Sequence, residues 1–272
     1  MVILGIETAT SVGSAALVSE TEIVAEYVLS TRSHSEQVLR EIDQILTNSG
    51  REMEECEAIA VSIGPGSFTG LRIGVSTAKA LAFAIQKPVM GISTLEALAC
   101  NVPLACGCVC PVIDARKGEV YTALYQWAEG TSGMLGTSGM LGTSGTLKVL
   151  IPEMAVSPMT MIQAVAQLGQ LAQVDHVAHV NMVQQMVQPL DRSPKILFVG
   201  NGARLYEGMI RERLGERAEF LPRYYHYPRA SVVAGLGLNR LALQQFDRVE
   251  TLAPTYLRPS DAEINWVQKH GS

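Results

Sequence analysis

The order of strand-like and helix-like segments is the feature that most restricts how this chain can fold. In the first half, the patterns predict strands over 2–8, 11–19 and 23–30, a helix over 34–49, a strand over 58–63, a helix over 69–86, a strand over 88–92 and a helix from 93 to 100. The second half predicts strands over 106–115, 119–127 and 147–151, a helix over 158–171, a strand over 196–200 and helices over 203–214 and 231–245. Three strands, a helix, a strand and a helix therefore occur twice, which indicates two tandem βββαβα units of the α/β class.

This repeated unit resembles the plan of the actin, sugar-kinase and Hsp70 superfold, which is also called ribonuclease H-like. We expect an N-terminal subdomain over 1–103, because Pro103 breaks the preceding helix. A C-terminal subdomain is expected over 104–247, with a Gly-, Ser- and Thr-rich hexapeptide repeat at 131–148 as a surface insertion, and another variable loop over 173–188. Residues 248–272 are expected to be an extended tail, since Pro254 and Pro259 interrupt any helix there.

Composition limits the classes of function. Hydrophobic residues make up 47% of the 272 residues and charged residues 17%, which is typical of a globular chain. The net charge of -5 argues against a protein that binds nucleic acid by its own electrostatics. The N-terminus lacks the pattern of a signal peptide, and no uninterrupted apolar run reaches ~18 residues, so a cytoplasmic protein without a membrane span is expected. The five cysteines are then expected to be reduced thiols.

A glycine-rich turn, GPGSFTGLRIG at 64–74, follows the strand over 58–63 and leads into the next helix. Such a turn can hold a phosphate at the helix N-terminus, but Gly70 is followed by Leu71 and not by the lysine of a phosphate-binding loop. Near the N-terminus, Glu7 and Ala9 stand where nucleotide-binding chains of this plan carry Asp and Gly, so the phosphate site is expected to be degenerate. The candidate phosphate-adjacent residues are Thr8, Thr10, Gly66 and Ser67.

Small residues recur at every fourth position of the helix over 69–86. They are Gly70, Gly74, Ala78 and Ala82, and they form one row that lets another backbone approach closely. Two interpretations fit this row: the helix packs inside its own domain, or the row docks a partner subunit. Each glycine costs ~1 kcal/mol relative to alanine in an exposed helix, so a close contact is expected, but the pattern alone leaves both interpretations open.

Five ordered motifs resemble the TsaB (YeaZ) family. They are IETAT at 6–10, GPGSFTGLRIG at 64–74, GISTL at 91–95, IDAR with GEVY at 113–121, and PTYLR at 254–258. The resemblance implies a noncatalytic subunit that supports the metal-bearing TsaD as it transfers threonylcarbamoyl to the adenosine beside the anticodon of tRNA, with TsaE joining as an ATPase. It leaves open whether ATP or ADP binds at the subunit junction. It implies no catalytic residue, metal or cofactor in this chain, and contact with tRNA only through the complex.

By the same resemblance, the partner docks on the helices over 34–49 and 69–86. The expected interface residues are Val38, Leu39, Ile42, Leu46, Gly70, Gly74, Ala78 and Ala82. Without TsaD, this face can pair with itself around a twofold axis. Arg72 and Lys79 are expected to be solvated or partner-facing, because no nucleophile and base lie near them in the sequence.

Other functions are weighed against this expectation. A small-molecule kinase or ATPase of the same superfold, acting alone, is the main alternative, and the older peptidase label of the TsaD relatives is a weaker one. Asp114 is either a metal-holding carboxylate or, as we favour, a turn residue paired with Arg116. Three further patterns each have two explanations. The alternating cysteines Cys106, Cys108 and Cys110 and the pair His176 and His179 either bind a metal or are ordinary structural residues. The aromatic, basic stretch 223–229 either stacks on nucleic-acid bases or lies on the domain surface.

Overall fold

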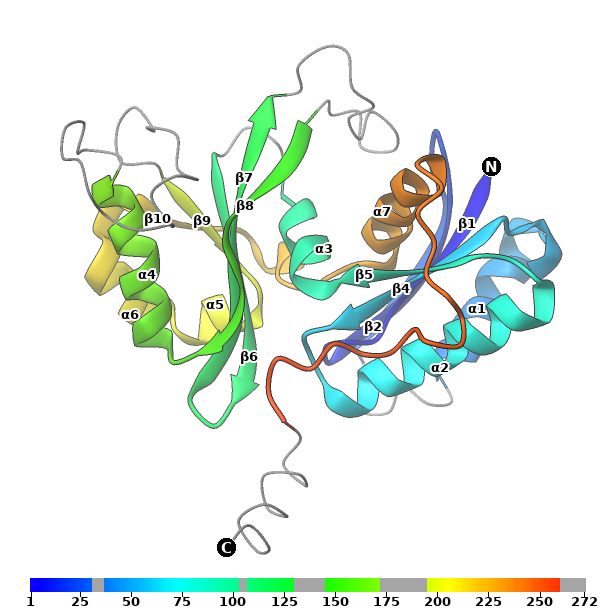
Figure 1. Cartoon of the computed structure of the whole chain (residues 1–272), viewed down its shortest axis with the longest axis horizontal. Coiled ribbons are helices and arrows are strands. Elements are labelled where there is room, and N and C mark those ends of the chain that lie inside the picture. The colour runs from blue at the N-terminus through cyan, green and yellow to red at the C-terminus, as the bar shows by residue number, and fades with distance from the viewer. Residues whose placement is uncertain (31–36, 103–106, 130–144, 172–194, 260–272) are drawn as a thin grey trace, which may run out of the picture. The chain divides into compact units, whose positions relative to one another are not determined.

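The computed structural model describes residues 1–30, 37–102, 107–129, 145–171 and 195–259. The chain divides into two units (Figure 1). The first comprises Met1–Thr94 together with the chain from Arg229 onward, and the second comprises Leu95–Pro228. Each unit contains one five-stranded sheet with helices on both faces.

The first unit has the sheet order β3-β2-β1-β4-β5. Its strands are β1 (Val2–Glu7), β2 (Val12–Ser19), β3 (Ile23–Ser30), β4 (Ala58–Gly64) and β5 (Val89–Ser93). Strands β1, β2 and β3 are antiparallel neighbours, whereas β4 runs parallel to both β1 and β5. Its helices are α1 (Gln37–Ser49), α2 (Phe68–Ile85) and α7 (Ala230–Ala242), with a short 3-10 helix over Met53–Glu55.

The second unit repeats this connectivity with the sheet order β10-β9-β6-β7-β8. Its strands are β6 (Cys108–Arg116), β7 (Glu119–Glu129), β8 (Gly145–Val156), β9 (Ile196–Val199) and β10 (Ala218–Phe220). Its helices are α3 (Thr94–Cys100), α4 (Pro158–Leu171), α5 (Asn201–Leu205) and α6 (Glu207–Leu214), with 3-10 helices over Gly215–Arg217 and Arg223–Tyr225. Because the first three strands are antiparallel and the last two run parallel to the first, the expected α/β plan of two tandem βββαβα units is confirmed.

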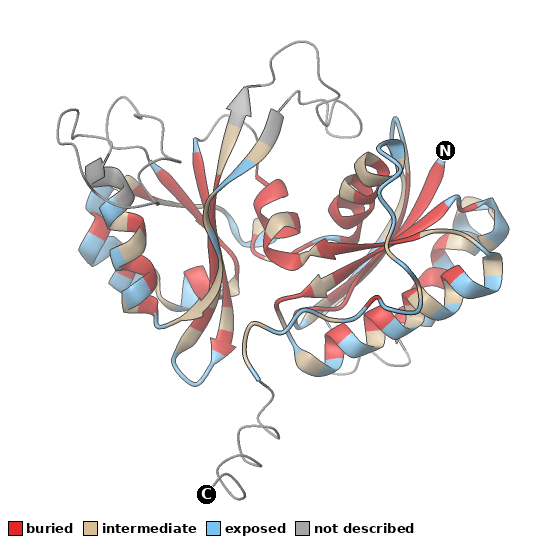
Figure 2. Ribbon diagram, in the orientation of Figure 1, coloured by how far each residue is buried: buried red, intermediate tan, exposed pale blue. Residues whose placement is uncertain are grey.

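Alternation along β1 divides the core of the first unit between two helical layers. Leu4 and Ile6 pack in one cluster with residues of α1 and α2, whereas Ile3 lies against Gly237 of α7 on the other face of the sheet. Buried residues accordingly line the sheet and the inner sides of the helices (Figure 2). Among the described helices, only α2 is long and apolar enough to cross a membrane by length and composition, but its buried row packs on this sheet.

The unit boundaries differ from those expected at residues 103 and 247. Helix α3 follows the last strand of the first sheet in the sequence, yet it packs in the second unit, where Leu95 and Leu98 join Val109 and Ile113. Helix α7 follows the second sheet but packs on β1, β2 and β4 of the first unit. Each half of the chain thus supplies a helix to the other half's sheet, which local sequence patterns do not reveal.

Two smaller expectations also change. The single helix expected over 203–214 is two helices, because Tyr206 between them has φ -108° and ψ 15°, outside the helical region. Strand β10 was not expected, since three residues are too short to show a strand pattern. Most of the repeat at 131–148, the loop over 173–188, and both His176 and His179 lie outside the described residues.

Candidate functional site

The glycine-rich turn joins β4 to α2 and is closed by local hydrogen bonds. Ser67 is the N-cap of α2, and its hydroxyl accepts a hydrogen bond from the Gly70 N–H at 3.3 Å. The Ser67 N–H donates to the Ala9 carbonyl at 2.7 Å. Two of the backbone donors that a phosphate would need at this helix N-terminus are therefore already bonded within the protein.

The end of β1 packs directly into the same turn. A Cβ added to Gly66 would lie 2.4 Å from the Ala9 carbonyl oxygen, so Ala9 fills the approach to this glycine. The Thr8 hydroxyl donates to the Gly70 carbonyl at 2.8 Å, and the Thr10 hydroxyl donates to the Val12 carbonyl at 3.1 Å. The structure thus brings the Thr8–Ala9 segment against Gly66, Ser67 and Gly70, whereas the Thr10 hydroxyl bonds to Val12 in its own turn. The approach to the turn is filled by protein groups and does not form an open cradle.

Glu7, the last residue of β1, is a buried carboxyl beneath this turn. Its side chain accepts hydrogen bonds from the Ser62 hydroxyl and, at 2.5 Å, from the Ala9 N–H. Burial raises the pKa of Glu7 from 4.5 to about 7, although both hydrogen bonds lower it in part. Glu7 thus connects the ends of β1 and β4 from inside the core.

The row of small residues on α2 faces the protein's own sheet, so the expectation that it docks a partner is wrong. A Cβ added to Gly70 would lie 2.0 Å from the Thr8 carbonyl oxygen, and one added to Gly74 would lie 2.2 Å from the Thr8 hydroxyl. Ala78 and Ala82 are also buried. The alternative interpretation, packing inside the same domain, is the one that the structure shows.

The four expected interface residues of α1 are partly buried in the core and partly accessible. Val38 and Ile42 are buried in the core of the first unit, so they do not line a docking face. Leu46 is partly buried, and Leu39 is 53% exposed. Of the eight residues expected at the interface, only these two leucines remain accessible to a partner.

The outward side of α2 carries apolar residues that the sequence analysis did not select. Phe83 is 70% exposed near the end of α2, and Ala80 and Ala84 are exposed beside it. The sequence held a signal for this, because Ala80, Phe83 and Ala84 lie outside the row of small residues that faces the sheet, and apolar residues on a second side of a helix indicate a second contact.

The chain after α7 lies along α2 over residues 248–258, a segment called the strap below, which begins with a turn at 249–251 (Figure 1). Lys79 donates to the carbonyls of Glu250 and Leu252 at 3.1 and 3.0 Å, and the Leu252 side chain is buried in the core. The Thr255 N–H donates to the Ile63 carbonyl at 2.7 Å. The motifs at 64–74 and 254–258 therefore meet, although they lie far apart in the sequence.

An aromatic and arginine cluster marks the point where these motifs meet. The rings of Phe68 and Tyr256 stack with centroids 4.7 Å apart. The Arg72 guanidinium lies over the Phe68 ring at 4.0 Å, and its Nε donates to the Tyr256 hydroxyl at 3.2 Å. Arg72 is exposed and Tyr256 is 40% exposed, so the cluster lies at the surface of the first unit.

The second unit shows a related turn at the ends of β6 and β9. The Asp114 N–H donates to the Asn201 side chain at 3.0 Å, and the Asp114 carboxylate accepts from the Arg116 N–H at 2.9 Å. This is the turn role that we favoured for Asp114, although its contact is with the Arg116 backbone. His226 is buried, with Nδ1 3.0 Å from the Gly200 N–H and Nε2 2.8 Å from a backbone carbonyl, so it holds this turn in place.

The remaining candidate side chains are the cysteines of β6 and the aromatic, basic stretch 223–229. Cys108 and Cys110 point to the same face of β6, as alternation predicted, and both are buried in one apolar cluster. Burial raises their pKa values to about 11 and about 12, which disfavours the reactive thiolate. Cys106 lies outside the described residues. In the stretch 223–229, Tyr224 is exposed at the surface of the second unit.

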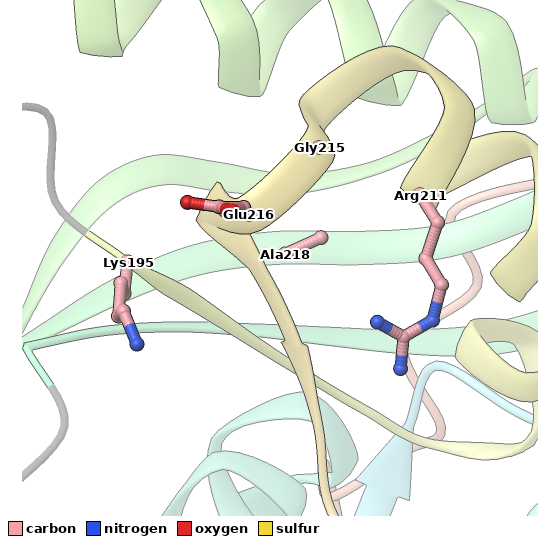
Figure 3. Close-up of a pocket in the computed structure, with 5 residues that line it drawn as sticks. All are labelled: Lys195, Arg211, Gly215, Glu216 and Ala218. Atoms are coloured by element: carbon pink, nitrogen blue, oxygen red, sulfur yellow. The ribbon is translucent and has the colours of Figure 1, made fainter.

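An open pocket lies at the edge of the second sheet (Figure 3). Its lining residues are Lys195, Arg211, Gly215, Glu216 and Ala218. Lys195 and Arg211 flank Ala218, but both cations already have partners. Lys195 pairs with Glu219, and Arg211 pairs with Glu207 at 2.9 Å. The pocket contains none of the residues that the sequence analysis selected.

Comparisons with known proteins match the whole of this architecture. A family model described as TsaD, tRNA N6-adenosine threonylcarbamoyltransferase, matches residues 22–266. The tRNA threonylcarbamoyladenosine biosynthesis protein TsaB of Bacillus subtilis (strain 168) is 30% identical over 269 residues, which are 98% of this chain and 99% of that protein. TsaB of Escherichia coli (strain K12) is 42% identical over 128 residues, which are 46% of this chain and 55% of that protein. The solved structure of YeaZ from Pseudomonas aeruginosa has a TM-score of 0.67 and 25% identity, covering 94% of this chain and 99% of that one.

The two sheets of identical connectivity and the turn closed by its own backbone define an α/β protein of the actin, sugar-kinase and Hsp70 plan. The similarity to the Bacillus subtilis protein extends over nearly the full length of both chains. The chain belongs to the TsaB (YeaZ) family.

Proposed function

We propose that this chain is a noncatalytic subunit of the tRNA threonylcarbamoyladenosine machinery. In this role it supports a TsaD threonylcarbamoyltransferase, which modifies the adenosine next to the anticodon of tRNAs that read A-starting codons. The observation that carries the proposal is the end-to-end similarity to the Bacillus subtilis TsaB protein. Since the substrate would be tRNA, we place the protein in the cytoplasm.

The packing of the turn at 64–70 supports a noncatalytic role over the alternative of a stand-alone kinase or ATPase. A phosphotransferase of this plan needs a backbone cradle for phosphate, and here Ala9 and Thr8 occupy the approach to Gly66 and Gly70. Binding of ATP or ADP would then require the junction with TsaD, where TsaE would join as an ATPase. No cofactor is proposed for this chain alone.

The outward side of α1 and α2 is the proposed docking face for TsaD. Both helices bury one side against the first sheet. On the other side, Leu39 is the exposed apolar residue of α1, and Phe83 is exposed on α2 together with Ala80 and Ala84. An exposed apolar face on a folded domain commonly marks a protein interaction site. In the absence of TsaD, two copies of this chain can cover the same face around a twofold axis.

Reconstitution of tRNA modification tests the function directly. Purified TsaD and TsaE should modify tRNA efficiently only when this chain is added, and the isolated chain should neither bind ATP tightly nor hydrolyse it. Full modification without this chain would contradict the subunit role. Rapid ATP turnover by the isolated chain would support the kinase or ATPase alternative.

Aspartate at Leu39 or at Phe83 is expected to weaken binding of TsaD by about tenfold or more, because a buried interface position cannot accommodate an unpaired carboxylate. The affinity can be measured by isothermal titration calorimetry with full-length proteins. Leu205→Asp is the matched control, since Leu205 is a 61% exposed leucine on α5 of the second unit. Equal loss of affinity in all three variants would contradict the assignment of this face.

A further inference from the structure

We propose that Arg72, held in place by Phe68 and Tyr256, binds a carboxylate of the partner protein at the N-terminal end of the docking face. Arg72 lies on the exposed side of α2, which is part of the proposed docking face, so the inference rests on the proposed function. It concerns a group of side chains that neither the core nor the closed turn uses. The site is a recognition site for an Asp or Glu side chain and performs no chemistry.

The geometry leaves the two terminal amino groups of Arg72 available. Phe68 supports the guanidinium plane at 4.0 Å, and the Tyr256 hydroxyl accepts the hydrogen bond from Nε. Among the described residues, no Asp or Glu side chain forms an ion pair with Arg72, whereas Arg51, Arg211, Arg229 and Arg240 each have one. An arginine that is oriented before binding loses less side-chain entropy when it forms a bidentate contact.

A close approach at Gly64 and a backbone hydrogen bond from Thr255 bring Tyr256 to this position. Gly64 has φ +120°, and a Cβ there would lie 2.5 Å from the Thr255 carbonyl oxygen, so only glycine lets the strap approach. The Thr255 N–H then donates to the Ile63 carbonyl at 2.7 Å. This bond positions the next residue, Tyr256, so that its ring stacks on the ring of Phe68. Tyrosine and arginine are the residue types most enriched at energetically dominant positions of protein interfaces.

A carboxylate fits the site better than a nucleic acid does. The planar guanidinium presents two parallel N–H donors, which match the two oxygens of a carboxylate. Binding of an RNA backbone usually requires several clustered cations, and the chain carries a net charge of -5. On this part of α2, Lys79 is already bonded to the strap, so it does not extend the positive surface.

The test is the affinity of full-length variants for the TsaD protein of the same cell, measured by calorimetry at two salt concentrations. Arg72→Glu is expected to weaken binding at least about tenfold, since it places a negative charge against the partner's carboxylate. Arg72→Lys should weaken binding about threefold, because lysine keeps the positive charge but lacks the two parallel N–H donors of the guanidinium. Tyr256→Phe should cause a smaller loss, and affinity in Arg72→Ala should depend less on salt than in the wild type. Arg213→Glu, at an exposed arginine of α6, is the control and should change nothing.

The outcomes separate this inference from the proposed function. If Arg72→Glu binds TsaD as the wild type does while Leu39→Asp does not, the docking face stands and the carboxylate site is wrong. If neither variant loses affinity, the docking face itself is wrong. If Arg72→Glu assembles normally but the complex loses affinity for tRNA, Arg72 faces RNA, and the carboxylate proposal is overturned. Circular dichroism of each variant verifies that it is folded.

Discussion

Gly70→Ala is expected to destabilise the first unit by about 3 kcal/mol, because the new methyl group has no room. Its Cβ would lie 2.0 Å from the Thr8 carbonyl oxygen, which belongs to the backbone of β1 and cannot rotate away. The substitution would force α2 off the sheet and disturb the hydrogen bond from the Thr8 hydroxyl to the Gly70 carbonyl. Urea unfolding of the full chain, followed by circular dichroism, measures the loss.

Gly208→Ala is the matched control for this prediction. Gly208 lies in the helix α6 (Glu207–Leu214), and nothing lies within 4 Å of the position that its Cβ would take. Alanine there should be neutral or should stabilise the protein by up to ~1 kcal/mol, as expected from helix propensity alone. A Gly70→Ala variant that is as stable as the wild type but fails to bind TsaD would show that the row of small residues faces the partner after all.

Glu7→Gln is expected to remove a pH dependence of about 3 kcal/mol from the stability of the protein. The pKa of Glu7 is raised from 4.5 to about 7 by burial, so the folded state holds a proton that the unfolded state releases between these values. Because the folded pKa is the higher one, the contribution of Glu7 is fully present below pH 4.5. It is lost as the pH rises through about 7.

The measurement is the difference in unfolding free energy between Glu7→Gln and the wild type at pH 5, 6, 7 and 8. Glutamine can still accept from the Ala9 N–H and contact Ser62, but it does not ionise. The difference should therefore shift in favour of the variant as the pH rises. Glu20→Gln, at an exposed carboxyl, should show no such trend. A difference that stays constant from pH 5 to 8 would mean that Glu7 is ionised in the folded protein at pH 5 already.

Local patterns predicted most of the helices and strands, because the spacing of apolar residues within a segment shows whether it is a helix or a strand. The strand over residues 23–30 and the helix over 158–171 have the expected bounds in the structure. The break at Tyr206 and the three-residue strand β10 were missed, since neither leaves a pattern of its own. The first residues of the helix expected over 34–49 lie outside the described residues.

The candidate site was predicted less well than the fold, for a physical reason. A row of small residues indicates that a backbone comes close, but the spacing cannot say whose backbone it is. In this protein it is that of β1, at Thr8. The same ambiguity affected Val38 and Ile42, which have the spacing of an interface but pack in the core.

The amino-acid sequence by itself determined the element order, the duplication of the βββαβα unit, and the glycine-rich turn between β4 and α2, because these depend on residues close together in the chain. Only the tertiary structure decided which side of α2 is free, where α3 and α7 pack, and that Tyr256 lies on Phe68 and Arg72. Those features depend on contacts between distant segments, and such contacts are selected by how the whole sheet buries its apolar faces.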